Sequence, residues 1–468
     1  MHWIEQSGRD CVRRIWSTFF VIVLGLTCAA AWGGSVAGSL DKGAGLRGFN
    51  LGARSATPFA NKDYADLAAY GANLVRIGVS VPISAGGETF DIAAGDWEYM
   101  DRTVAMGRKH GFKVILALVP IPLGEESVHW IRPDLKASLV EIWTRVAARF
   151  KGNPVIAGYD LINEPVTPRD RNQPSLLGQA LNRAARAYGA QDTNVDEWRA
   201  LATKMIQAIR AQDADSVIIF EPSPWALPKG FAQLTPLPFS KVVYSFHFYE
   251  PHALTHQGLY EYRAALDYPS QQTSRASLSN AMEPVRAFSR KYAVPIFVGE
   301  FSMVRWAPGD SASNYLKDAI ELFEAEGWNW TYHAFREYEG WDGELDQSLP
   351  KCKIAPRSGN AKVIRLLIEK VRQERASFIC MVVSMNSLSI SSPVETNEEW
   401  TDVVDHKSWA TKSMLSSRGG PSRRAAWRAG RSGHGPAASP ARPSPGRALV
   451  LSTWPEQHCA DCCQGHQA

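Results

Sequence analysis

The sequence predicts one (β/α)8 barrel in the middle of a chain of 468 residues. From residue 45 to residue 375, strand-like apolar runs alternate with amphipathic helix-like segments, the pattern of a parallel sheet covered by helices. Eight such units occupy about 330 residues, which is within the range of these barrels. Two of the apolar runs end in glutamate, and barrels of this class carry their functional residues at the carboxyl ends of strands.

The eight strands are expected at 47–52, 72–79, 112–119, a central run ending at 162, 216–220, 241–249, 296–298 and 328–335. Helices are expected at 61–70, 97–110, 135–150, 197–211, 277–292 and 312–326, with a closing helix at 361–375. Asn61 is a suitable cap for the first helix. The fifth unit is the least regular, because residues 222–238 predict a loop where a helix would follow.

Two of these strands deliver a carboxyl group to their ends. The central run ends in Asn163-Glu164-Pro165, where proline stops the strand. The seventh strand ends in Gly299-Glu300, 136 residues after the first glutamate. Either glutamate alone reads more simply as a surface residue, an ion-pair partner or a helix cap. Together, two carboxyls at the strand ends of one sheet are the minimum apparatus for cleaving a glycosidic bond.

Composition excludes several other classes of protein. The chain is 45% hydrophobic and 21% charged, as expected of a globular protein. Its net charge of +4 comes from seven arginines within residues 418–447, so it predicts no nucleic-acid partner. There is no phosphate-binding glycine loop and no dinucleotide motif, and we expect no cofactor. The cluster His458-Cys459-Ala460-Asp461-Cys462-Cys463 could bind a metal, but it lacks two spaced pairs, and we expect no metal.

The two ends of the chain differ from the middle. Residues 1–31 read as a signal peptide, with Arg13-Arg14, an apolar run at 19–26 and small residues at 29–31. This predicts a secreted or periplasmic protein without a stable membrane partner; the alternative is an uncleaved segment that anchors it in a membrane. None of the seven cysteines lies between Cys28 and Cys352. Residues 376–468 are rich in Arg, Pro, Ser and Gly and predict a disordered tail after a catalytic domain at 45–375.

Residues on four strands, taken in chain order, resemble the pattern of a known family. Arg76 lies on the second strand, Asn163-Glu164-Pro165 ends the fourth, His247-Phe248-Tyr249 lies on the sixth and Gly299-Glu300 ends the seventh. This set resembles glycoside hydrolase family 5, the cellulase-like retaining glycosidases, over residues 45–375. The resemblance implies a (β/α)8 barrel that cleaves β-glycosidic bonds of a polysaccharide or oligosaccharide by double displacement.

The resemblance also implies a role for each of these residues. Glu164 would be the general acid and then the base, and Glu300 would be the nucleophile. Arg76 and Tyr249 would hold Glu300 ionised. Asn163 would contact the 2-hydroxyl of the sugar. His247 would face the substrate or tune the acidity of Glu164. The alternative is that Arg76 and His247 belong to an ordinary buried polar network.

Aromatic platforms are expected as well, because sugar rings have apolar faces. The candidates are Trp225, Trp330, Trp341 and the Tyr332-His333 pair, with Trp330 preferred on the eighth strand and Trp341 as the alternative in a loop. The family commonly has Tyr-Trp where this chain has Tyr332-His333, so the stacking residue is expected elsewhere. The third strand also departs from the family, because no histidine stands near its end; His129 is the nearest substitute.

Three functions remain open from the sequence. The first is an endoglucanase-like retaining hydrolase, the second a barrel that binds glycans without cleaving them, and the third a transglycosylase with the same site. The carboxyl pair favours an enzyme. A monomer is expected, and the sugar and the linkage are not specified by the residues.

Overall fold

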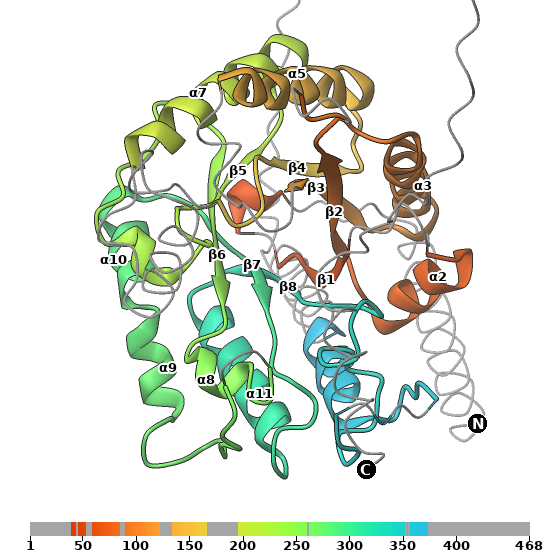
Figure 1. The fold of residues 1–468 in the computed structure, drawn as a ribbon, viewed down its shortest axis with the longest axis vertical. Coiled ribbons are helices and arrows are strands. Elements are labelled where there is room, and N and C mark those ends of the chain that lie inside the picture. The colour runs from red at the N-terminus through yellow and green to blue at the C-terminus, as the bar shows by residue number, and fades with distance from the viewer. Residues whose placement is uncertain are drawn as a thin grey trace, which may run out of the picture. The chain divides into compact units, whose positions relative to one another are not determined.

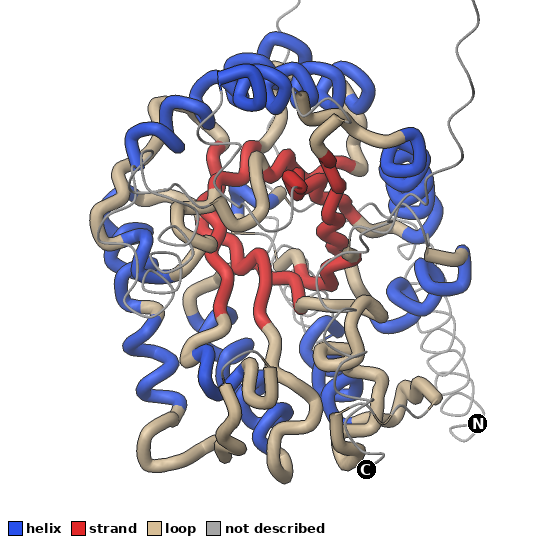
Figure 2. The backbone as a smooth tube through the Cα atoms, viewed as in Figure 1, coloured by secondary structure: helices blue, strands red, loops and turns tan. Residues whose placement is uncertain are grey.

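A computed structural model describes residues 39–43, 45–52, 59–84, 89–121, 133–165, 195–259, 262–351, 353 and 356–372. Eight parallel strands form a closed barrel in chain order, and β8 pairs back onto β1. Figure 2 shows the strands as an inner ring with helices around it. The predicted (β/α)8 fold is therefore confirmed.

The strands are β1 (Arg47–Leu51), β2 (Leu74–Pro82), β3 (Lys113–Ile121), β4 (Ile156–Asp160), β5 (Ile218–Phe220), β6 (Val242–Phe248), β7 (Ile296–Phe301) and β8 (Asn329–Tyr332). Each expected strand is found, with shifted ends. The central strand stops at Asp160, so the Asn163-Glu164-Pro165 segment lies just beyond its end rather than within it. Figure 1 shows β6 and β7 side by side, with α8 (His252–Thr255) beyond their carboxyl ends.

The helices of the outer layer are α2 (Asn61–Tyr70), α3 (Ala94–His110), α5 (Pro133–Phe150), α7 (Val195–Gln212), α9 (Arg275–Ala281), α10 (Glu283–Tyr292) and α11 (Ser311–Ala325). Residues 362–372 are also helical. Between β5 and β6, where the chain is fully described, only the short helix η3 (Pro228–Phe231) forms, in agreement with the loop predicted there.

Two helix predictions need correction. The helix expected at 277–292 is two helices that meet at Met282. Pro284 lies in the first turn of α10, where its missing N–H is tolerated but where it could not continue α9. Asn61 is the first residue of α2 and not its cap; the carboxylate of Asp63 accepts the N–H of Ala60 (2.7 Å) at this helix start.

The barrel interior changes from apolar to polar along the strands. Near their amino ends it is filled by Leu74, Ile115, Ile219, Val243 and Phe297, onto which Leu40 of η2 (Leu40–Lys42) packs. Two residues further along β2 comes Arg76, and beyond Val243 on β6 come Ser245 and His247, all buried. Alternate residues of a strand share one face, so these polar groups continue the same inner face. The polar residues at the carboxyl end of the barrel therefore lie next to an apolar layer that fills its amino end.

The predicted signal peptide at 1–31 and the predicted tail at 376–468 lie outside the described residues. None of the described helices is long and apolar enough to cross a bilayer.

Candidate active site

Arg76 of β2 joins the polar residues at the carboxyl end of the barrel. Its five N–H groups all have acceptors: Asp160 Oδ2 (2.9 Å), Asn50 Oδ1 (3.0 Å), Glu300 Oε1 (2.8 Å), Asn163 Oδ1 (2.8 Å) and Glu221 Oε1 (3.0 Å). Burial opposes the positive charge, but the neighbouring carboxylates outweigh it and raise the pKa of Arg76. The guanidinium is thus a permanent cation that fixes five side chains, which come from β1, β7 and the carboxyl ends of β4 and β5.

Glu300 lies on β7 with both carboxylate oxygens bound. Arg76 Nη1 donates to Oε1 over 2.8 Å, and the Tyr249 hydroxyl donates to Oε2 over 2.9 Å. Burial alone would raise the pKa of Glu300, but His247, His333 and Arg76 together with this hydroxyl hold it well below its usual range. Glu300 is therefore ionised at neutral pH, the state that a nucleophile needs.

Glu164 follows β4 in an unusual backbone conformation. Its φ is 48°, a left-handed value that is uncommon for residues other than glycine. Its backbone N–H donates to Glu221 Oε2 over 2.7 Å, and His247 Nδ1 lies 2.8 Å from its Oε1. The side chain is 33% exposed, against 9% for Glu300, so Glu164 is the carboxyl that solvent or a ligand reaches more easily. The turn thus presents this carboxyl at the mouth of the barrel.

His247 of β6 lies between the two glutamates. One oxygen each of Glu164 and Glu300 and one nitrogen of His247 all lie within 4.8 Å of one another. Burial opposes a charge on the imidazole, but Glu221 and Glu300 outweigh it and raise the pKa of His247 well above its usual range. Such an imidazolium has no lone pair for a cation, so this cluster fits a proton-bearing site better than a metal site.

Sequence reasoning missed two buried carboxyls of the site. Glu221 follows β5 and accepts from His247 Nε2 (2.9 Å), while Asp160 ends β4 and accepts from Arg76 Nε (2.9 Å). Burial opposes ionisation of Glu221, but His247 and Arg76 lower its pKa; burial and the Glu221 charge raise the pKa of Asp160. A signal existed, because Phe220-Glu221-Pro222 repeats the strand, glutamate and proline order of the Glu164 segment.

Trp330 is wrongly predicted as a sugar platform. It is fully buried, and it packs edge-on against Phe301 (5.6 Å) on the helix side of the sheet. The next residue, Thr331, is the one that points into the barrel, where its hydroxyl bonds Gly299 O (2.6 Å). Alternation along β8 therefore gives the inner face to Thr331 and the outer face to Trp330.

Of the other four aromatic candidates, Tyr332 is buried in the core, and the remaining three lie closer to the site. Trp225 is half-buried beside the Glu164 turn, since its backbone N–H donates to Pro165 O (3.1 Å). His333 follows β8 and places Nδ1 3.5 Å from Glu300 Oε2. Trp341 is half-buried and packs against His333, with ring centres 5.4 Å apart and planes at 63°. His333 and Trp341 therefore lie beside Glu300, and the backbone of Trp225 lies beside the turn that carries Glu164.

The departure at the third strand remains as the sequence predicted it. On β3 the pairing partner of Ser80 is Val119, followed by Pro120, so this strand end carries no polar side chain. His129 and residues 166–194, which include most of the loop after Glu164, lie outside the described residues.

Comparisons with known proteins show the family and the fold of the chain. Residues 39–339 match the family model described as cellulase, glycosyl hydrolase family 5. Endoglucanase C of Acetivibrio thermocellus is 21% identical over 57% of this chain and 81% of that protein, and cellodextrinase A of Ruminococcus flavefaciens is 22% identical over 57% and 75%. Among solved structures, endoglucanase Cel5A of Thermotoga maritima is similar with a TM-score of 0.54 at 18% identity, covering 71% of this chain and 100% of that one. At this identity the structural match shows the fold alone.

Proposed function

Because the chain belongs to glycosyl hydrolase family 5, the cellulase family, we propose that it hydrolyses β-glycosidic bonds with retention of configuration. The observation that carries this proposal is the closeness of the two glutamates, whose nearest oxygens lie within 4.8 Å. Retaining enzymes keep their carboxyls about 5 to 5.5 Å apart, whereas inverting enzymes leave about 6.5 to 9.5 Å for a water molecule. The separation supports direct attack by one carboxylate.

In the first step, Glu300 attacks the anomeric carbon and forms a covalent ester with the sugar. The bond from that carbon to the departing oxygen breaks, and Glu164 gives its proton to this oxygen. His247 Nδ1 lies 2.8 Å from Glu164 Oε1, so a protonated His247 is within reach to supply Glu164 with a proton. Glu300 suits the nucleophile because Arg76 and Tyr249 keep it ionised and aimed.

In the second step, Glu164 takes a proton from water, and the resulting hydroxide attacks the same carbon. The ester bond to Glu300 breaks, so the configuration is inverted twice and retained overall. Asn163 suits the sugar 2-hydroxyl, because Arg76 holds its amide oxygen (2.8 Å) and leaves its NH2 group as a donor. Bonds to this hydroxyl strengthen as positive charge develops on the sugar.

The proposed substrate is a β-linked glucan or a related polysaccharide or oligosaccharide. Two relatives bear the names endoglucanase and cellodextrinase, which favours a β-glucan among the possible polymers. The half-buried Trp225 and Trp341 would contact sugar rings on either side of the carboxyl pair. Signal-peptide features at residues 1–31 support export, and sequencing the amino terminus of protein recovered from the medium or periplasm would test it.

The test is turnover of aryl β-glycosides and of β-glucan, mannan and xylan fragments by wild type, Glu300→Ala and Glu164→Ala. We expect no turnover by Glu300→Ala, and partial rescue of Glu164→Ala by azide, with a β-glycosyl azide as product. An inverted product would contradict the retaining mechanism. Longer oligosaccharides as main products would indicate transglycosylation, and binding without turnover by folded wild type would indicate a glycan-binding barrel.

A further inference from the structure

Two buried nitrogens beside the nucleophile have no hydrogen-bond partner among the described residues. They are His333 Nδ1 and Trp341 Nε1. Buried N–H groups are almost always bonded, since an unpaired one has lost water without compensation. Two such groups in neighbouring side chains, with ring centres 5.4 Å apart, mark a place where a ligand atom could complete the bonding.

Both nitrogens can act as donors. The indole nitrogen is always a donor. His333 Nδ1 faces Glu300 Oε2 at 3.5 Å, and an N–H on that nitrogen is favoured over a lone pair that would face a carboxylate. His333 Nε2 lies 4.0 Å from Glu337 Oε2 on its other side. The pair therefore offers two hydrogens to an oxygen acceptor.

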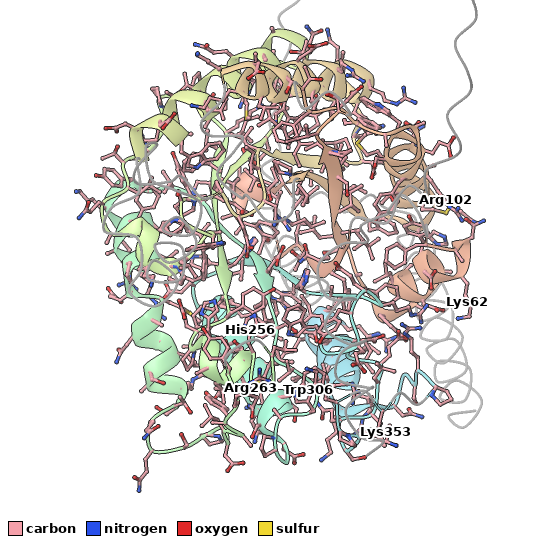
Figure 3. The ribbon with its side chains drawn as sticks, in the orientation of Figure 1. Lys62, Arg102, His256, Arg263, Trp306 and Lys353 are labelled. Atoms are coloured by element: carbon pink, nitrogen blue, oxygen red, sulfur yellow. The ribbon has the colours of Figure 1, made fainter. Side chains whose placement is uncertain are left out.

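The main chain at both residues is fixed by hydrogen bonds without a ligand. The N–H of His333 donates to Phe301 O (3.1 Å). On either side of the Trp341 amide, Arg305 N donates to Gly340 O (2.7 Å) and the Tyr332 hydroxyl donates to Trp341 O (2.7 Å). The ring of His256, which Figure 3 labels, packs edge-on against Trp341 with ring centres 5.4 Å apart. A site fixed in this way is preorganised for binding.

We propose that His333 Nδ1 and Trp341 Nε1 form a hydrogen-bonding subsite for one hydroxyl oxygen of the sugar whose anomeric carbon faces Glu300. A hydroxyl oxygen has two lone pairs and can accept from both nitrogens. This inference rests on the proposed function. It assigns a hydroxyl other than the 2-hydroxyl, because Asn163 lies after β4 whereas His333 and Trp341 follow β8, on the other side of Glu300 in the strand order.

The experiment measures kcat/KM for wild type, His333→Phe and Trp341→Phe, which keep an aromatic ring but remove the N–H. The substrates are the aryl β-glycoside that wild type hydrolyses best and analogues deoxygenated singly at each free position of the sugar next to the aryl group. Trp306→Phe is the matched control, since Trp306 Nε1 already donates to Gln257 O (2.8 Å). Thermal unfolding checks that each variant is folded.

We expect each of the two variants to lose roughly 10-fold on the parent substrate, the effect of one hydrogen bond. On one deoxy analogue, not the 2-deoxy one, the loss should shrink to less than about 2-fold, because the bonded hydroxyl is already gone. Trp306→Phe should follow wild type on every substrate. An equal loss on all analogues, or no loss at all, would overturn the subsite.

If the proposed function is wrong, folded wild type will turn over no substrate, and this result is distinct from a failure of the subsite. The same variants and deoxy sugars would then be compared by calorimetric binding. The same selective loss for one analogue would support the subsite in a non-catalytic barrel, and its absence would overturn it there too.

Discussion

The backbone N–H of Glu164 donates to Oε2 of Glu221 over 2.7 Å, so one carboxylate fixes the main chain that carries the other. Glu164 has a left-handed φ of 48°, a conformation that costs about 1 to 3 kcal/mol and persists only when its surroundings enforce it. The other oxygen of Glu221 accepts from His247 Nε2 over 2.9 Å. Glu221 thus supports both the backbone and the imidazolium partner of Glu164.

Replacing Glu221 by glutamine should impair acid catalysis selectively. The change removes the buried negative charge that favours protonated His247, so the pKa of His247 falls and the protonated form is lost at a lower pH. We expect the alkaline limb of the kcat/KM profile to move to lower pH. Activity should fall about 100-fold for substrates with poor leaving groups, within the range of general acid catalysis.

Activated aryl glycosides, whose leaving group needs little protonation, provide the control for Glu221→Gln. Their hydrolysis should change by less than about 10-fold, because the first step then depends little on the acid. A surface charge change, Asp215→Asn, should leave both substrates unaffected. Equal losses on activated and poor substrates would show that Glu221 has only a structural role.

Replacing Arg76 should cost more than any surface ion pair. Arg76→Lys offers three donors on a compact group in place of five in a planar fork, so it cannot bond all of the present acceptors. Arg76→Met would leave Asp160, Glu221 and Glu300 without their cation, and we expect a loss of about 3 to 5 kcal/mol in unfolding free energy. Denaturant unfolding would measure both variants. A methionine variant as stable as wild type would contradict this account.

The lowered pKa of Glu300 predicts a pH dependence of stability. A carboxyl with a folded-state pKa below its unfolded value, about 4.3 for glutamate, stabilises the fold fully above that value. That contribution is lost as the pH falls towards the folded pKa. Wild type should therefore lose stability relative to Glu300→Gln as the pH falls from about 5 to 3. Urea unfolding of both proteins over this range measures it, and parallel curves would contradict it.

Trp330 should matter for stability and not for the substrate. It is fully buried between β8 and the outer helices, so Trp330→Ala should cost about 3 to 5 kcal/mol of unfolding free energy. The milder Trp330→Phe should remain folded, and its KM should equal that of wild type because the ring lies outside the barrel interior. A raised KM for Trp330→Phe with unchanged thermal stability would show that Trp330 does contribute to substrate binding.

Periodicity and strand ends were sufficient to predict the barrel, because each strand and helix pattern is local. The same logic found Glu164 and Glu300. It does not find Glu221, because the segment that follows it, residues 222–238, predicts a loop. The prediction for Trp330 fails for a different reason: alternation shows that Trp330 and Tyr332 share a face, but only the packing of Thr331 decides which face is inside.

The sequence does not predict the side-chain contacts between residues that are far apart in the chain. No pattern indicates that one guanidinium would bond Asn50, Asp160 and Glu221 as well as the predicted Glu300. These contacts depend on the strand register around the closed barrel. The same holds for the pairing of His333 with Trp341, eight positions apart in a loop.

Gly299 sets how closely β6 and β7 approach below the nucleophile. A Cβ at this position would lie 2.6 Å from Ser245 Oγ and 3.0 Å from His247 Nε2, both too close for an ordinary contact. Gly299→Ala should therefore displace His247 from Glu164 and reduce kcat/KM by about 100-fold or more, since small misplacements near the reacting groups are costly. Adding Ser245→Ala removes the closer contact and should restore part of the activity. If Gly299→Ala is fully active, or if the second change gives no recovery, the close packing of these strands does not position His247.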